Sequence, residues 1–162
     1  VIDAVLEATG LARFFAATVS SEEVPRGKPA PDVYREVLEE PDPERQLRLN
    51  ARNSRAVKTR AGALLGVIRS AAPADPEIAG LWHRIQSEFY DNQRAIVEVL
   101  LEKKALRPGL DVTRATDILW TLNHPDLWLL LVRERGWTPE QYETWFRDTA
   151  GAQLLRGLSR RR

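Results

Sequence analysis

The stretch "LRPGLDVTRATDILWTLNHPDLWLLLVRERGWTPEQYETWF", residues 106–146, decides the fold class because helix start signals recur along it. Asp111 stands where an N-cap residue is expected, one position before an apolar-periodic run. Thr138 is followed by a proline and then by Gln141, which together match a capping box with proline at the first helical position. These signals predict a series of helices with short connections between them.

Upstream of this stretch the pattern is also helical. Asp75-Pro76-Glu77 predicts the start of a helix that runs to about Lys104, because Asp is a good N-cap, Pro suits the first turn and Glu complements the helix dipole. Its expected inward residues are Ile78, Leu81, Trp82, Ile85, Phe89, Ile96, Val99 and Leu100. The helix before it, from about residue 44, is predicted to place Val57, Ala61, Leu64, Leu65 and Ile68 on one inward stripe.

His124 directly precedes Pro125, and a proline disfavours helix in the residue before it. We therefore expect His124 to cap a helix, "DLWLLLVRER", that runs to Gly136. The second histidine, His83, is 41 positions away, and no carboxylates stand at metal-ligand spacing. Neither a metal site nor a catalytic histidine is predicted.

The first forty residues follow a different pattern. A helix is predicted up to Gly10, a short β-prone run at residues 15–21, and a second helix over residues 31–40, which begins at Pro31. A single strand needs a sheet, and no later segment supplies one. The expected fold class is therefore mainly all-α, a helical bundle preceded by a short α/β fragment.

Composition is that of an ordinary globular protein, with 43% hydrophobic and 29% charged residues and no cysteine. The lack of cysteine excludes disulfides and thiolate metal sites. No apolar run approaches the roughly 18 residues that span a bilayer, and no signal peptide is predicted. We expect a cytoplasmic protein without a membrane partner and without a cofactor.

Charge divides the chain into two unequal parts. Residues 1–44 hold four basic and ten acidic side chains, a net charge of −6, whereas the remainder holds twenty basic and thirteen acidic ones, a net charge of +7. Such a shift predicts a boundary near residues 41–43. The predicted organisation is a fragment at 1–42, a helical domain at 43–158 and a basic tail at 159–162.

The segment "LEATGLARFFAATVSSEEVPRGKPAPDVY", residues 6–34, resembles the haloacid dehalogenase-like hydrolases around their third motif. The resemblance implies that Lys28 would contact the phosphoryl group, where an ammonium offsets developing negative charge. The aspartate nucleophile motif and the magnesium-binding acidic pair of that family are absent from this chain. A lone lysine without them is not a catalyst, so we predict no enzyme activity.

A second resemblance covers residues 43–158. The pieces "AAPADPEIAGLW", "ALRPGLDVTRATDILWTL" and "LLVRERGWTPEQYETWF" resemble the C-terminal regulatory domain of TetR-family transcriptional repressors. This resemblance implies a helical bundle that binds a small, largely apolar effector and pairs its last helices with a second subunit. The helix-turn-helix of such repressors is not found in residues 1–42, where five Gly and Pro residues would break a three-helix arrangement. The acidic segment would also be repelled by DNA, so this chain alone is not expected to bind an operator.

Aromatic side chains are the candidate functional residues. Those predicted to line an effector pocket are Trp82, Phe89, Trp120 and Trp128, against the alternative that they only fill the core. Those predicted at a homodimer interface are Trp128, Tyr142, Trp145, Phe146 and Thr149. Three polar residues of the long helix, Tyr90, Asn92 and Gln93, are expected to face solvent rather than a ligand.

The leading hypothesis is therefore a ligand-sensing and dimerisation module of TetR-repressor type that lacks its DNA-binding part in this chain. One alternative is an incomplete haloacid dehalogenase-like hydrolase whose remaining motifs lie outside the chain. Another is a junction of two unrelated pieces in which residues 1–40 pack poorly on the bundle.

Overall fold

The computed structural model of the chain describes residues 31–157, with side chains from residue 34 onward. This part contains helices and no strand, and a single isolated bridge joins Leu106 to Leu155. The all-α prediction is confirmed for these residues. The predicted helix up to Gly10, the strand at 15–21, the loop with Lys28 and the tail at 159–162 lie outside the described residues.

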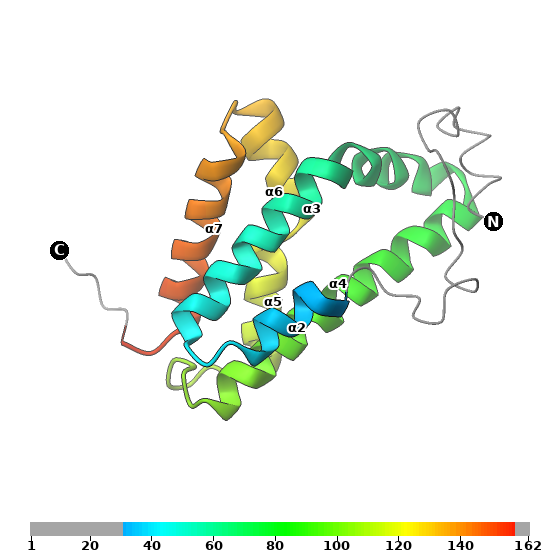
Figure 1. Ribbon diagram of the computed structural model, residues 1–162. Helices are drawn as coiled ribbons and strands as arrows, with labels where there is room; N and C mark the ends of the chain where they lie inside the picture. Colours follow the sequence, from blue (N-terminus) through cyan, green and yellow to red (C-terminus); the bar gives the residue numbers. More distant parts are fainter. Residues whose placement is uncertain (1–30, 158–162) are drawn as a thin grey trace. The chain divides into compact units, whose positions relative to one another are not determined.

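The elements, in chain order, are α2 (Pro31–Glu39), α3 (Pro43–Ala71), the 3-10 helix η2 (Ala72–Ala74), α4 (Pro76–Glu102), α5 (Val112–Leu122), α6 (Pro125–Trp128), the π-helix η3 (Leu129–Glu134) and α7 (Pro139–Leu154) (Figure 1).

The chain divides into two compact units, Val1–Asp32 and Val33–Arg162, and the second contains the helices α3 to α7. Most of α2 belongs to this second unit as well, because Val37 is only 1% exposed and lies in the same core cluster as residues of α3, α4 and α7. This division falls near the start of α2, whereas the charge pattern changes near residues 41–43.

The predicted helix starts are confirmed by their hydrogen bonds. The Asp75 carboxylate accepts from the backbone N–H of Glu77 at 2.8 Å. Asp111 accepts from the N–H of Arg114, also at 2.8 Å. At α7 the capping box is complete in both directions, since Thr138 Oγ1 accepts from the N–H of Gln141 and Gln141 Oε1 accepts from the N–H of Thr138. Each such cap stabilises its helix by about 1 kcal/mol.

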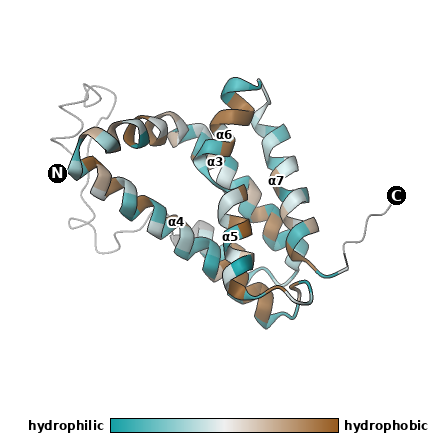
Figure 2. Cartoon of the chain, turned by 180° about the vertical axis from the view of Figure 1, so that it is seen from behind, coloured by the Kyte–Doolittle hydropathy of each residue, from teal (hydrophilic) through white to brown (hydrophobic). Residues whose placement is uncertain are grey.

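Helix α3 is central to the second unit. It packs against α7, α4 and α6, while α5 packs against α4 and α7. Figure 1 shows α3 between α7 and α4, and Figure 2 shows hydrophobic stretches on α5 and α6. The core consists of side chains from all these helices. Its members on α3 to α7 are Leu47, Ala51, Ile96, Val97, Leu100, Ala115, Leu119, Trp128, Tyr142, Phe146, Ala150 and Leu154.

The inward face of α3 differs from the predicted stripe. Val57, expected inside, is 44% exposed, whereas its neighbour Lys58 is 1% exposed. The buried residues of the helix are Gln46, Leu47, Asn50, Ala51, Ser54, Lys58, Gly62 and Leu65. The stripe prediction was wrong at Val57 because polar residues spaced four apart fill the face that packs against α4 and α7.

The segment predicted as one helix from residue 125 to Gly136 has two geometries. It begins as α6, and from Leu129 it continues with π-helical geometry as η3. Gly136 follows with φ of 72°, a left-handed conformation that suits glycine, and the N–H of Trp137 then donates to the carbonyl of Leu131 at 2.9 Å. π-Helical turns of this kind are rare and are frequently found at functional sites.

Candidate functional site

The most unusual feature of the bundle is a row of buried polar side chains on α3, which we call the polar column. Its members, Gln46, Asn50, Ser54 and Lys58, recur every four residues and therefore lie on one face of the helix. All four are buried. Burying such groups costs free energy unless they find hydrogen-bond partners, so their partners define what the column does.

Lys58 lies at the C-terminal end of the polar column. Its ammonium donates to Ser54 Oγ at 2.5 Å and to Asn123 Oδ1, and the hydroxyl of Ser54 donates to the same Asn123 oxygen. These acceptors are neutral. Within residues 34–157 no carboxylate forms an ion pair with Lys58. The structure thus holds a buried cation without a counter-charge.

Burial lowers the pKa of Lys58 to about 7. An ammonium removed from water loses hydration that neutral hydrogen-bond partners replace only in part, so the uncharged amine is favoured. Lys58 therefore changes charge near neutral pH, where an exposed lysine stays protonated. Perturbed groups of this kind are concentrated at functional sites.

Aromatic rings cover the ammonium from two helices. The Lys58 nitrogen lies 5.8 Å from the ring centre of Phe89 on α4 and 5.4 Å from that of Tyr142 on α7. Trp128 meets Tyr142 edge to face, with 5.0 Å between ring centres. The Tyr142 hydroxyl donates to the carbonyl of Leu122 at 3.1 Å, and burial raises the pKa of this tyrosine. Cation–π contact stabilises the charged amine, although less than a carboxylate would.

Glycine allows the close approach of Trp128 to α3. A Cβ atom at Gly62 would lie 3.1 Å from Trp128 Nε1 and 3.3 Å from its Cδ1. The indole therefore packs directly on the helix backbone, one turn after Lys58.

The polar column continues onto α4 through Gln93. Its Oε1 accepts from Asn50 Nδ2 at 3.2 Å, while its Nε2 is buried without a partner. Gln93 is 0% exposed, so the prediction that it faces solvent was wrong. Tyr90 instead donates from its hydroxyl to Asp117 at 3.0 Å, and Asn92 hydrogen-bonds with Tyr34.

A second cluster surrounds His124, next to the Asn123 that binds Lys58. His124 caps α6 as predicted, with Nδ1 accepting from the N–H of Asp126 at 3.3 Å. Its other ring nitrogen lies 3.1 Å from Gln86 Oε1. Trp82 and Trp120 meet the imidazole ring edge to face, at 6.4 and 4.9 Å between ring centres.

The electrostatics of this second cluster favour a neutral imidazole. Burial is the main cause that lowers the pKa of His124, and the positive charges of Arg69 and Lys58 add to it, while Asp126 opposes them. Two donors beside the ring, Gln86 Nε2 and Trp120 Nε1, are buried without an acceptor.

The four residues predicted to line a pocket are thus divided between two adjoining clusters. Phe89 and Trp128 belong to the surroundings of Lys58 and Tyr142, and Trp82 and Trp120 to those of His124. Lys58, Ser54, Asn123 and Gln93 were missed. The recurrence of Asn50, Ser54 and Lys58 at intervals of four was the available signal, but polar residues on a helix usually indicate a solvent-exposed face.

The residues predicted at a dimer interface are in different situations. Trp128, Tyr142 and Phe146 are buried in the core of the unit itself. Trp145 and Thr149 remain partly exposed on α7, and Thr149 borders a shallow depression of about 400 Å³ between α5 and α7, lined also by Ile118 and Leu122. A partner subunit would therefore reach Trp145 and Thr149, and not the other three.

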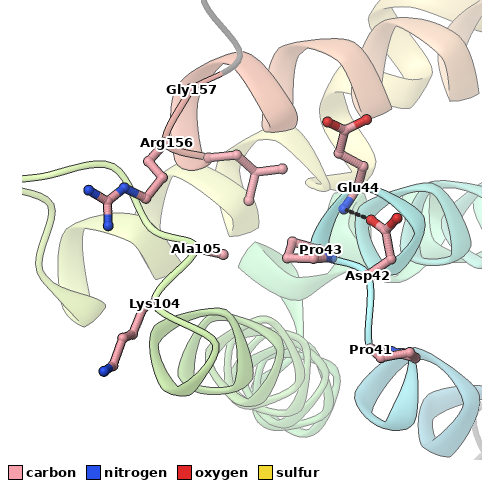
Figure 3. Close-up of a pocket in the computed structure, with 9 residues that line it drawn as sticks. Pro41, Asp42, Pro43, Glu44, Lys104, Ala105, Arg156 and Gly157 are labelled. Carbon is pink, nitrogen blue, oxygen red and sulfur yellow. Dashed lines mark hydrogen bonds between the residues drawn. The ribbon is translucent and has the colours of Figure 1, made fainter.

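A larger open depression, of about 690 Å³, lies between the start of α3 and the residues that directly follow α7 (Figure 3). Figure 3 shows the charged ends of Lys104 and Arg156 pointing away from Asp42 and Glu44. Asp42 is engaged as the N-cap of α3 and accepts from the N–H of Glu44 at 2.8 Å. No set of side chains converges here, so we place no site in it.

Metal binding and membrane insertion find no support in the described part. Across residues 31–157 no group of three or more His, Asp and Glu side chains is arranged to hold a metal ion. Over the same range, none of the helices combines the length and the apolar run that crossing a bilayer requires. Lys28 lies outside the described residues.

Comparisons of the chain with protein-family models, with curated proteins and with solved structures find no match. The protein class defined by the described residues is therefore a helical bundle with a buried, cationic polar cluster enclosed by aromatic rings.

Proposed function

We propose that residues 43–158 form the ligand-sensing and dimerisation module of a TetR-type transcriptional repressor. The observation that carries this proposal is the polar cluster of Ser54, Lys58 and Asn123, which lies in the helical core beside Phe89 and Tyr142. Small-molecule sites in proteins have this character, mostly apolar and aromatic walls with a few convergent polar groups. The resemblance of the helix junctions to that family supports the same function.

A purely structural role explains the cluster poorly. Apolar residues of similar size would fill the same space without the desolvation cost of an ammonium, and such replacements are often neutral or stabilising. Several buried donors also lack acceptors, among them Gln86 Nε2, Gln93 Nε2 and Trp120 Nε1. Groups that a folded chain leaves unsatisfied are groups that a ligand can satisfy.

The mechanism is a shift between helix arrangements. An effector bound between α3 and α4 would favour the helix arrangement in which it makes the most contacts. By linkage, it would also shift the conformation of any domain or subunit that contacts α3 or α7. In a complete repressor this changes the separation of the DNA-reading domains.

Ligand binding is tested by screening small, largely apolar compounds for an increase in the melting temperature of the full chain. A compound at 100 times its Kd raises stability by about 2.7 kcal/mol. The response should weaken in Phe89→Ala, which removes a ring beside Lys58, and should persist in Val57→Ala, which alters an exposed side chain on α3. A response that is equal in both variants would place the ligand elsewhere.

Dimerisation is tested by sedimentation equilibrium at micromolar concentration. We expect a dimer for the wild-type chain and for Thr144→Arg, which changes an exposed residue of α7. Thr149→Arg places a charge beside the depression between α5 and α7 and should give a monomer. A wild-type chain that is strictly monomeric would contradict this half of the proposal.

A further inference from the structure

One face of α4, which packs against the polar column and His124, carries alternating aromatic and amide side chains. Trp82, Gln86, Phe89 and Gln93 are spaced at intervals of three and four, so they lie on one face of the helix. Two contacts fix this face against α3, the hydrogen bond of Asn50 with Gln93 and the cation–π contact of Lys58 with Phe89. Polar donors and aromatic rings therefore occupy the same interface.

This interface has an excess of positive charge and of hydrogen-bond donors. Lys58 supplies a positive charge with neutral partners, and the unpartnered buried atoms on α4, at Gln86 and Gln93, are N–H donors. Trp120 Nε1, beside His124, is a further donor without an acceptor. What is missing is a group that carries negative charge and accepts hydrogen bonds.

We propose that the effector of this module is an organic acid, whose carboxylate binds Lys58 and whose aromatic or apolar body packs on the rings of α4. This inference rests on the proposed function and names its ligand class. A carboxylate forms charge-assisted hydrogen bonds with an ammonium, which are roughly twice as strong as neutral ones. It also replaces the hydration that Lys58 loses on burial.

A monoanion fits the site better than a phosphate. Lys58 is the one cation of the Ser54–Lys58–Asn123 cluster, and the neighbouring His124 is held toward its neutral form by burial. A phosphate dianion buried there would keep an uncompensated charge, which is costly in a low-dielectric interior. A single carboxylate leaves the pair neutral.

Proton uptake is the signature that separates this site from a merely structural lysine. Burial lowers the pKa of Lys58 to about 7, and a bound carboxylate favours the charged amine and raises that pKa again. Binding above neutral pH must then be accompanied by uptake of a proton. The affinity for the acid should fall as the pH rises above 7, by up to about tenfold per pH unit, and should level off below pH 6.

The other titratable groups facing Lys58 do not change charge in this range. His124, from the turn before α6, has a pKa lowered from 6.5, and Tyr142, from α7, has a pKa raised from 10.0. Helix α4 presents the neutral side chains of Phe89 and Gln93. A pH dependence between 7 and 9 therefore reports on Lys58.

The experiment compares 2-naphthoate with 2-naphthamide, which has nearly the same shape and no charge. Isothermal titration calorimetry of the full chain at pH 6 and pH 8.5, in two buffers of different ionisation enthalpy, measures both affinity and proton uptake. We expect naphthoate to bind at least about tenfold more tightly than naphthamide at pH 6. Proton uptake at pH 8.5 should occur with naphthoate alone.

Variants assign the effect to the residue. Lys58→Met keeps the length of the side chain and should abolish the preference for naphthoate over naphthamide. Arg60→Met removes an exposed positive charge from the same helix and should keep the preference. If Lys58→Met does not fold, the wild-type pH profile and proton uptake remain as the test.

Three outcomes would overturn the proposal. Equal affinity of the wild-type chain for both compounds would do so while leaving effector binding itself intact. A preference for naphthoate that persists in Lys58→Met would move the anion site elsewhere. Absence of binding by either compound at about 1 mM would exclude the organic acid class represented by the probe.

Discussion

Lys58 and Asn123, separated by 65 positions in the chain, are joined in the helical core by a hydrogen bond from Nζ to Oδ1. This contact connects the middle of α3 to the end of α5. It places an ammonium where only neutral groups surround it, and the proposed function and ligand class both depend on that arrangement.

The pH dependence of stability should report the buried lysine directly. The pKa of Lys58 falls from 10.5 to about 7 on folding, so between these values the unfolded chain binds a proton that the folded chain does not. Stability therefore rises with pH across this window, by up to about 1.4 kcal/mol per pH unit, and the cost of burial is fully present below pH 7. Guanidinium unfolding at pH 7, 8 and 9 should show the rise in the wild-type chain and a flatter profile in Lys58→Met. Parallel profiles of the two chains would show that Lys58 keeps an ordinary pKa.

Two glycine substitutions should have opposite effects on stability. Gly62→Ala brings a Cβ to 3.1 Å from Trp128 Nε1, and the indole is only 3% exposed, so it has little room to move. We expect a net loss of about 1 kcal/mol, since overpacking costs about 1–3 kcal/mol and helix propensity recovers up to about 1 kcal/mol. Gly80→Ala on α4 meets nothing nearer than 3.8 Å and should gain about 0.5–1 kcal/mol. Chemical denaturation of both variants measures the contrast, which a gain at Gly62 would refute.

Two tyrosine substitutions test the importance of the buried hydroxyl. Tyr142→Phe removes the hydrogen bond to the Leu122 carbonyl but keeps the ring that faces Lys58, and it should cost about 1 kcal/mol. Tyr90→Phe removes a comparable bond to the exposed Asp117 and should cost close to zero, because water replaces it. Thermal denaturation measures both losses of stability. A larger loss in Tyr90→Phe than in Tyr142→Phe would contradict the prediction.

Truncation tests where the helical unit begins. A chain that starts at Pro31 retains α2, and its melting temperature should equal that of the helical unit in the full chain. A chain that starts at Pro43 loses Val37, a core residue that is 1% exposed, and should be less stable by at least about 2 kcal/mol. Equal melting temperatures for the two truncated chains would show that α2 does not stabilise the helical unit, and would favour a domain boundary at residues 41–43.

Phosphatase activity distinguishes the alternative function. With magnesium and an aryl phosphate we expect no turnover, because the sequence lacks the aspartate nucleophile motif and acidic pair that would accompany Lys28. Turnover that disappears in Lys28→Ala would establish hydrolase chemistry and overturn the regulatory function.

The candidate site was only partly predictable. Phe89 and Trp128 were predicted as pocket-lining residues. Phe89 covers the ammonium together with Tyr142, which was predicted at a dimer interface, and Trp128 packs on Tyr142. Their selection followed from aromatic character and helical spacing. Lys58 was not predicted as a site residue because a lysine on a long helix is ordinarily exposed. Its neighbours in the sequence do not distinguish a buried lysine from an exposed one.

By itself the sequence determined where four of the helices begin. Asp75, Asp111, His124 and Thr138 cap the helices that come after them because a capping side chain acts on backbone groups two or three residues away, within reach whatever the rest of the chain does. Only the tertiary structure decided which face of α3 is buried, that Gln93 points inward, and that Tyr142 and Phe146 belong to the core. Those outcomes depend on contacts between residues far apart in the chain, whose energies are set by packing and desolvation.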